Sequence, residues 1–414
     1  MKKTFTLSLA IMLYGTLLLA GGFQINDHSG RSVGMAFSTV ANPTDASAIF
    51  FNPAAITELD GNSNLSLGLS YIIPGSKFTG FTNMNQQNTT ELENWNFAIP
   101  HFFGTWKTPL NNLSLGVGVF VPFGLGTKWP DDWVGRHSAL KTYLQTIEIN
   151  PVLAYKFDIS DVPISIAAGY GYAIGNVELK KAISTFTPEV VLTLKGDGTA
   201  STFNYGLLVE PSKKLKIGAS YRHNIEMKYD GNTTYENTQG LSALFQEGNG
   251  KATIKFPDDI RFGVAYQVSD NLSLEAGINY MGWSSYDTLK IVFDKGPGNP
   301  SQSYTSSSPR DYKDVITYRI AGEYLFDKTA IRLGFYYDPL AVDAKNVEPV
   351  LPESNRLGFT AGFGYKFADN FNVDLGYLGI YGTQTEVSGN PNGFDGYYNT
   401  WANIISLTLS YTIK

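Results

Sequence analysis

The stretch NIISLTLSYTI, residues 403–413, decides the fold class because its apolar and small polar residues alternate. Its leucines and second isoleucine fall on one face of an extended chain, and its serines and threonines fall on the other. The stretch NLSLGLSY, residues 64–71, has the same period of two. Successive side chains of a strand point to opposite faces, so each stretch predicts a strand that separates an apolar environment from a polar one.

About 14 such segments follow one another from residue 63 to the C-terminus. They lie near residues 63–72, 96–107, 113–122, 142–157, 163–180, 201–211, 215–229, 251–268, 272–290, 315–326, 330–338, 355–367, 371–382 and 401–413. Short polar connections alternate with long ones, and the long ones are 73–95, 123–141, 181–200, 230–250, 291–314, 339–354 and 383–400. This arrangement is typical of an outer-membrane barrel. We predict an all-β, transmembrane antiparallel β-barrel.

The alternative for such strands is a secreted sandwich or propeller. That architecture would need a continuous apolar inner layer, whereas the second face here carries Gly, Ser, Thr, Asn and charge. Lipid offers no hydrogen bonds, so a sheet within it must close and leave no edge. A closed barrel with a polar interior satisfies both conditions.

The composition narrows the function. Charged residues are 16% of the 414 residues, against roughly 25% in soluble globular chains. There is no cysteine, the four histidines have no metal-site spacing, and no nucleophile-elbow motif occurs. A net charge of -6 gives no support for nucleic-acid binding. We predict no catalytic residue, no metal, no cofactor and no enzyme activity; a hydrolase whose triad assembles from distant positions stays an alternative.

Residues 1–20 have the features of a secretory signal peptide. Two lysines precede an apolar run from Leu7 to Leu19, and cleavage is expected after Ala20. The alternative is a single membrane anchor, but the run is short for a span and lacks a basic flank. We expect an exported chain that resides in the outer membrane of a Gram-negative bacterium.

Residues 21–60 do not alternate. They combine glycine and small residues with apolar ones such as Phe23, and they contain Asn52-Pro53-Ala54. A barrel of about 14 strands encloses a wider lumen than a packed eight-stranded one, and a segment of this size fits it. The alternative is a solvated tail, against which the apolar residues argue. We predict a hatch at 21–60, with a fixed turn at 52–54, and a barrel at 61–414.

Several motifs, in order along the chain, carry a resemblance to a known family. They are Gly22-Phe23-Gln24-Ile25-Asn26, Asn52-Pro53-Ala54, Asn150-Pro151, Trp283-Ser284-Ser285, Tyr312-Lys313-Asp314 followed by Tyr318-Arg319-Ile320, and Leu351-Pro352 ahead of Arg356. Over essentially its whole mature length the chain resembles the FadL/TodX family of outer-membrane long-chain fatty acid and hydrocarbon transporters. The resemblance implies a fourteen-stranded barrel with an N-terminal hatch. One departure is the end Ile413-Lys414, where outer-membrane strands usually carry an aromatic residue.

Inward charges are the candidates for ligand recognition. Alternation turns Arg319 and Arg332 inward, since a cation on the lipid face at mid-depth costs about 2–4 kcal/mol. The resemblance places a carboxylate-binding lysine near Arg310 and Lys313, while a second family arginine has no counterpart near Ile174. We predict that at least one of these four basic residues binds the polar head group of a ligand. The alternative is that they pair with other charges or with the hatch.

Two long connections, 181–200 and 230–250, carry apolar residues that need a partner or a ligand if exposed. These are Phe186, Val190, Leu192, Leu241, Leu244 and Phe245. The resemblance implies that the two loops form a groove for initial capture of substrate. The alternative is that the loops pack against each other.

The third alternating stretch meets Pro122-Phe123-Gly124. Proline cannot donate to a sheet ladder and glycine weakens a strand, so we predict a kink or bulge there. The resemblance aligns Phe123-Gly124 with an inward kink of the family and an opening in the wall beside it. The alternative is that Pro122 begins the loop 123–141.

Together these inferences predict passive uptake of hydrophobic molecules, long-chain fatty acids first, through an apolar pocket and a lateral wall opening. Each buried CH₂ gains about 0.8 kcal/mol on leaving water, so an apolar route suits such solutes. We expect a monomer whose partners are the ligand and outer-membrane lipid. The alternatives are an aromatic hydrocarbon channel and, in another class, a structural or adhesive barrel.

Overall fold

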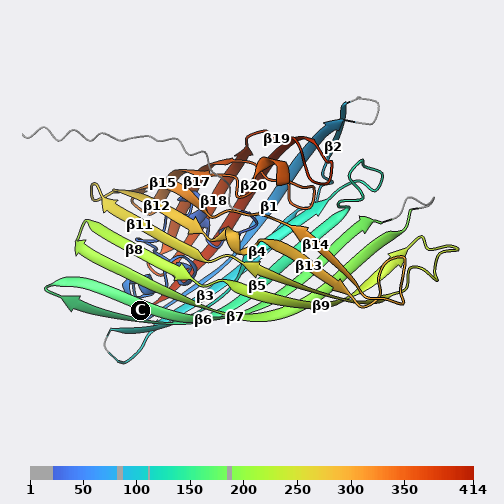
Figure 1. Ribbon diagram of the computed structural model, residues 1–414. Coiled ribbons are helices and arrows are strands. Elements are labelled where there is room, and N and C mark those ends of the chain that lie inside the picture. The colour runs from blue at the N-terminus through green and yellow to red at the C-terminus, as the bar shows by residue number, and fades with distance from the viewer. Residues whose placement is uncertain (1–21, 82–86, 111, 184–188) are drawn as a thin grey trace, which may run out of the picture.

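The computed structural model describes residues 22–81, 87–110, 112–183 and 189–414; the expected signal peptide, residues 1–20, lies outside this range. The described chain forms one antiparallel sheet that closes on itself, because β1 (Ser63–Phe81) pairs with β20 (Gly396–Ile413) along nearly its whole length. Counting each interrupted strand once, the barrel has 14 strands, as the sequence predicts (Figure 1).

The remaining strands are β2 (Gln87–Glu91), β3 (Phe97–Lys107), β4 (Leu113–Lys128), β5 (Lys141–Ile159), β6 (Val162–Ala182), β7 (Val191–Ser212), β8 (Leu215–Arg222), β9 (Ile225–Glu236), β10 (Gly248–Phe256), β11 (Asp259–Gln267), β12 (Leu272–Met281), β13 (Thr288–Phe293), β14 (Tyr304–Pro309), β15 (Val315–Phe326), β16 (Thr329–Asp338), β17 (Arg356–Ala368), β18 (Phe371–Gly382) and β19 (Thr385–Val387). The helices are α1 (Gly30–Gly34), α2 (Ala48–Phe51), and the 3₁₀ turns η1 (Pro53–Glu58), η2 (Trp283–Ser285) and η3 (Ala344–Asn346). None of the described helices combines the length and the apolar character needed to cross a membrane.

The two faces of the sheet differ as the alternation predicts. On β1, Leu67 is 58% exposed on the outside, whereas Ser66 and Ser70 are fully buried on the inside. On β20, Leu407 is exposed and Thr408 is buried. The polar face is therefore covered within the barrel and the apolar face is directed to lipid.

The strands run further than the sequence indicates. β4 continues to Lys128, inside the predicted loop 123–141, and β7 begins at Val191, inside the predicted loop 181–200. Part of the β7 extension, Lys195-Gly196-Asp197-Gly198, has no apolar residue on either face. Above the lipid, neither face of a strand needs to be apolar, so the alternation that reveals the membrane part is lost in this stretch.

Four neighbouring strands are interrupted, and for three of them the sequence predicts continuity, over 215–229, 251–268 and 272–290. The interruptions separate β8 from β9, β10 from β11, β12 from β13 and β14 from β15. Pro257 has no N–H for the ladder, and Asp258 accepts a hydrogen bond from the Asn224 backbone N–H at 3.0 Å instead. The parity of the buried residues changes across the first break, from Arg222 to Ile225 and Met227.

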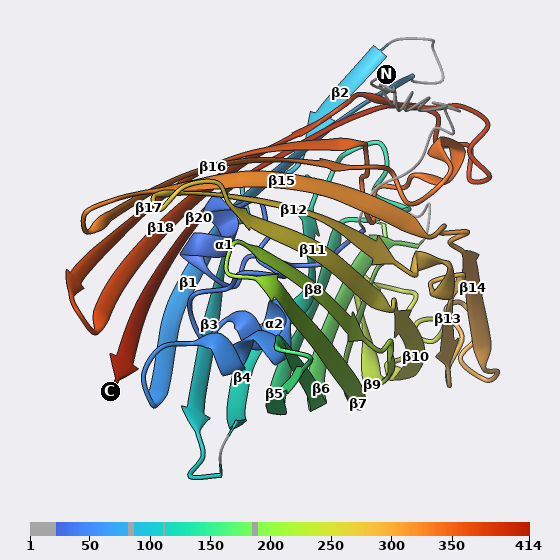
Figure 2. The same cartoon turned by 90° about the vertical axis from the view of Figure 1, so that its left-hand side faces the viewer.

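Residues 22–60, called the N-terminal segment below, touch strands on opposite sides of the barrel. α1 packs against β17, β18 and β20, while η1 packs against β5, β6 and β7. In Figure 2 both α1 and α2 lie within the ring of strands. Asn52 caps η1 by accepting from the Ala54 N–H at 3.2 Å, and its own amide donates to the Leu207 carbonyl of β7 at 3.0 Å.

A buried ionic network joins this segment to the wall. The Arg31 guanidinium donates to both carboxylate oxygens of Glu323, at 3.1 and 3.0 Å, and to Glu275 at 3.1 Å. Glu323 also accepts from Arg332, which donates in turn to Asp374 at 2.6 Å. All five side chains are buried. Since removing one member of a buried pair leaves an uncompensated charge, the network fixes the position of α1.

Candidate functional site

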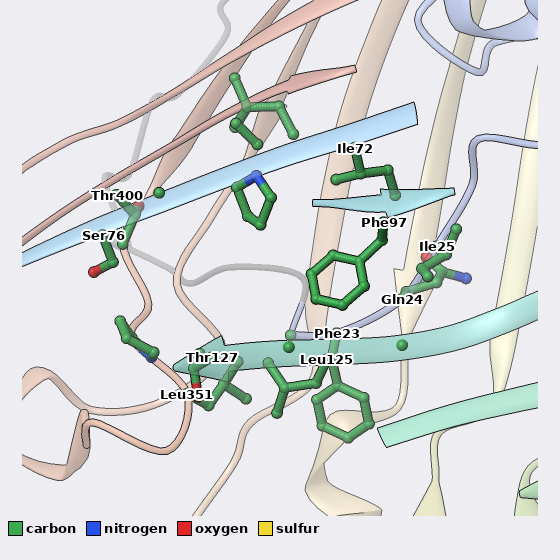
Figure 3. Close-up of a pocket in the computed structure, with 18 of the residues that line it drawn as sticks. Phe23, Gln24, Ile25, Ile72, Ser76, Phe97, Leu125, Thr127, Leu351 and Thr400 are labelled. Atoms are coloured by element: carbon green, nitrogen blue, oxygen red, sulfur yellow. The ribbon is translucent and has the colours of Figure 1, made fainter. Parts of the chain in front are cut away.

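An apolar cavity of about 220 Å³ lies between the N-terminal segment and the wall formed by β1, β3, β4 and β5. We call it the wall cavity. Figure 3 shows Phe23 and Ile25 of the N-terminal segment beside Phe97 of β3 and Leu125 of β4. Most of the lining is hydrocarbon or aromatic, which suits a hydrophobic ligand.

The wall beside this cavity is incompletely paired. β3 and β4 pair from Lys107↔Ser114 only as far as Phe102↔Val119, and the described part of β3 before Phe102 has no ladder partner in β4. The register between β4 and β5 shifts between Phe120 and Phe123. The alternative that Pro122 begins a loop is wrong, since β4 continues through it to Lys128.

The N-terminal segment replaces the missing neighbour of β4. The Ile25 N–H donates to the Pro122 carbonyl at 2.9 Å, and the Gly124 N–H donates to the Phe23 carbonyl at 3.1 Å. A Cβ atom at Gly124 would lie 2.6 Å from the Ile25 Cδ1 atom, so glycine permits this close approach. The backbone groups that the irregularity leaves without partners in the sheet therefore form hydrogen bonds on the inside of the barrel.

A second, smaller cavity, called the inner cavity, adjoins the first. Phe23, Leu125, Leu144 and Leu351 line both. Arg310 contributes to the inner wall, where its Nη1 donates to Glu348 at 2.6 Å, while its buried Nε has no hydrogen-bond partner among the described residues. Tyr286 and Tyr312 line the same wall. Burial raises the pKa of both phenols, so they remain hydrogen-bond donors at neutral pH.

The four basic candidates lie in four different surroundings. Arg310 lines the inner cavity, and Arg319 lines a small polar cavity with Asp27 and Asp338. Lys313 is half-exposed and paired with Asp343. Arg332 belongs to the buried network that holds Arg31. The structure thus brings two of the four, Arg310 and Arg319, to cavities.

The apolar residues expected in a capture groove are only partly exposed. Val190 and Leu192 are buried, because β7 begins at Val191 and pairs with β6. Their expected exposure is therefore wrong. Leu244 is 41% exposed, Leu241 and the Phe245 ring beside Tyr235 are partly covered, and Phe186 lies outside the described residues.

Some lining residues were missed by the sequence reasoning. Ser76, Glu353 and Arg356 line the wall cavity, although they come from β1, a loop and β17. Leu351-Pro352 ahead of Arg356 is one of the family motifs, but nothing in this motif indicates that Glu353 is buried. Within the described ranges, no three His, Asp or Glu side chains gather as a metal site.

Comparison with known proteins agrees with this geometry. The model of the family described as outer membrane protein transport protein (OMPP1/FadL/TodX) matches residues 11–413. The long-chain fatty acid transport protein of Escherichia coli O6:H1 is 26% identical over 428 residues, which cover 93% of each protein.

Two solved structures share the fold. The FadL homologue of Pseudomonas aeruginosa superposes with a TM-score of 0.82 at 20% identity, covering 95% of this chain and 100% of that one. The P. putida toluene transporter TodX superposes with a TM-score of 0.73 at 14% identity, covering 92% and 97%. This chain is an outer-membrane transporter of hydrophobic molecules, and it belongs to the outer membrane protein transport protein family of OMPP1, FadL and TodX.

Proposed function

We propose that this protein takes up long-chain fatty acids by diffusion through the inner cavity and the wall cavity. The observation that carries the proposal is the shared boundary of the two cavities, with Arg310 on the inner wall and hydrocarbon along the rest. A carboxylate head group fits the free Nε of Arg310, and charge-assisted hydrogen bonds are stronger than neutral ones. The acyl chain then extends along apolar side chains.

The N-terminal segment serves as the hatch in this proposal. Its support is the buried Arg31 network and the packing of α1 and η1 on opposite walls. A ligand that enters from outside meets this segment before it reaches the lumen below. The hatch directs it to the wall rather than through the barrel.

The exit is the incompletely paired wall between β3 and β4. Phe97 and Ile99 of β3 and Val121 of β4 line the wall cavity where the two strands part. A hydrophobic molecule that leaves there enters lipid and is not rehydrated, which would cost about 0.8 kcal/mol per CH₂.

Aromatic hydrocarbons are the second candidate substrate. Phe97, Tyr143 and Trp401 line the wall cavity, and aromatic walls suit aromatic ligands. The experiment is uptake of labelled oleate and toluene by cells that lack their own transporter and express this chain. Faster oleate uptake than in cells with an empty vector supports the proposal. Faster toluene uptake alone supports the second candidate, and no increase for either contradicts both.

A further inference from the structure

One end of the wall cavity carries the hydroxyl side chains of Ser76 and Thr400. Figure 3 shows Ser76 and Thr400 together, away from Gln24 and Ile25. Ser76 and Thr400 are paired across β1 and β20. The Thr400 hydroxyl is hydrogen-bonded to the Ser354 hydroxyl, and Ser354 follows Glu353 in the chain. Glu353 and Ser76 both line this cavity, whose lining is mostly apolar but also includes Gln24 and Asp27.

Two polar groups in this lining have no hydrogen-bond partner within the described part of the chain. Glu353 is 3% exposed, and neither of its carboxyl oxygens has a hydrogen-bond partner among the described residues. Ser76 is also 3% exposed, and its hydroxyl likewise has no hydrogen-bond partner among the described residues. Buried polar groups are nearly always hydrogen-bonded, so two unpartnered ones on residues that line one cavity point to a ligand.

Glu353 has a basic neighbour, Arg356, but forms no ion pair with it. The nearby Arg356 donates through Nη2 to the Gly22 carbonyl at 3.0 Å, and its Nε lies 3.4 Å from Asp338. Glu353 forms no ion pair among the described residues. Burial raises the pKa of its carboxyl to about 8, in spite of the attraction of Arg356. At neutral pH this carboxyl is a neutral group with one O–H donor and acceptor oxygens.

We propose that Glu353 and Ser76 form a subsite for a neutral oxygen, the hydroxyl or carbonyl of an otherwise apolar molecule, so that the wall cavity favours alcohols and ketones over alkanes. The inference rests on the proposed function, because it names a substrate class for the same uptake route. A neutral carboxyl donates to such an oxygen and a serine hydroxyl donates or accepts. An alkane leaves both groups unsatisfied. A carboxylate ligand, in contrast, has its partner in Arg310 of the inner cavity.

The test is the affinity of the full mature protein, held in amphipol, for three ligands of equal chain length: dodecane, 1-dodecanol and dodecanoate. We expect Glu353→Met to raise the dissociation constant of 1-dodecanol about tenfold, with dodecane bound as well as before or better, since tenfold corresponds to the loss of one modest hydrogen bond. Ser76→Ala should give a smaller loss of the same kind. Glu353→Gln keeps a donor and should retain most of the affinity.

The matched control is Glu386→Met, because Glu386 is an exposed carboxylate on β19. This substitution should change the affinity for neither 1-dodecanol nor dodecane. An unchanged ratio of 1-dodecanol to dodecane affinity in correctly folded Glu353→Met overturns the inference. Tighter binding of dodecylammonium than of 1-dodecanol to the wild type also overturns it, because it would show a charged carboxylate. Failure of the wild type to bind dodecane or dodecanoate would instead count against the proposed function.

Discussion

Replacing Arg31 by methionine should release the N-terminal segment without opening the barrel. Methionine keeps much of the side-chain volume but removes all three hydrogen bonds to Glu323 and Glu275. Glu323 retains Arg332, whereas the fully buried Glu275 carboxylate loses the one ion pair that it forms among the described residues. Breaking a buried ion pair in this way costs about 3–5 kcal/mol.

The whole cost should appear in local opening of the segment, because the barrel ladder does not include it. A loss of about 3–5 kcal/mol corresponds to exchange that is about 10² to 4 × 10³ times faster, at roughly 1.4 kcal/mol per tenfold. Hydrogen exchange followed by mass spectrometry should show this acceleration in peptides that contain α1. Peptides from β18 and β20 should keep their protection and serve as the internal reference.

Two further variants isolate the cause. Lys77→Met removes an exposed pair, in which the Lys77 Nζ lies 3.6 Å from Glu91, and should cost less than about 1 kcal/mol. Adding Glu275→Gln to Arg31→Met should restore much of the protection, because the orphaned charge is removed. Equal exchange in Arg31→Met and Lys77→Met would refute the reasoning, as would a uniform loss of protection across the barrel.

Three other predictions concern the route of the ligand. Gly124→Leu places a side chain against Ile25 and the β3–β4 gap, so oleate uptake should fall at least about tenfold at an equal amount of folded barrel. The control is Gly104→Leu, because the nearest contact of a side chain there is Leu65 on the lipid side. Unimpaired uptake in Gly124→Leu would argue against the exit. Arg310→Met should weaken dodecanoate binding about 10- to 100-fold and leave dodecane binding unchanged, since hydrogen bonds to charged groups contribute about 1.5–3 kcal/mol. Lys313→Met, which removes the side chain paired with Asp343, is the control and should change the affinity for neither ligand. Equal losses for both ligands in Arg310→Met would exclude head-group binding. The affinity for 2-dodecanone, which only accepts hydrogen bonds, should fall between pH 7 and 9, because the Glu353 carboxyl donates below its pKa of about 8 and loses its proton above it. Arg356, Asp338, Tyr312 and Tyr286 lie near this group, and burial raises the pKa of both tyrosines further above that range. A fall that persists in Glu353→Gln would assign the titration elsewhere.

The barrel could be predicted from the sequence because each membrane strand has one face in lipid and one in a polar interior. That difference can be recognised from residues that are neighbours in the sequence, such as the exposed Leu67 and the buried Ser66. The cavities could not be predicted in the same way. The lining of the wall cavity comes from the N-terminal segment, from strands at both ends of the chain and from the loop before β17, and only folding brings these together.

The basic candidates illustrate the same limit. Arg310 and Lys313 are three residues apart in one connection, yet Arg310 lines the inner cavity and Lys313 pairs with Asp343 near the surface. Both residues are basic and lie in the same connection, so the sequence gives no reason to prefer one of them as the residue that binds a head group. Glu353 is a similar case, because a carboxylate in a loop is ordinarily solvated and its burial depends on residues far away in the chain.

The aligned interruptions of β8/β9, β10/β11, β12/β13 and β14/β15 separate two regions with independent registers. In an unbroken strand, an insertion of one residue moves every side chain beyond it to the other face. Here the irregular residues between the two halves absorb such a shift before it reaches the lipid-facing rows of β8, β11, β12 and β15. The outer half of this wall is thus free to gain or lose residues during evolution, so its ligand preference can diverge while the membrane-embedded half keeps its sequence pattern.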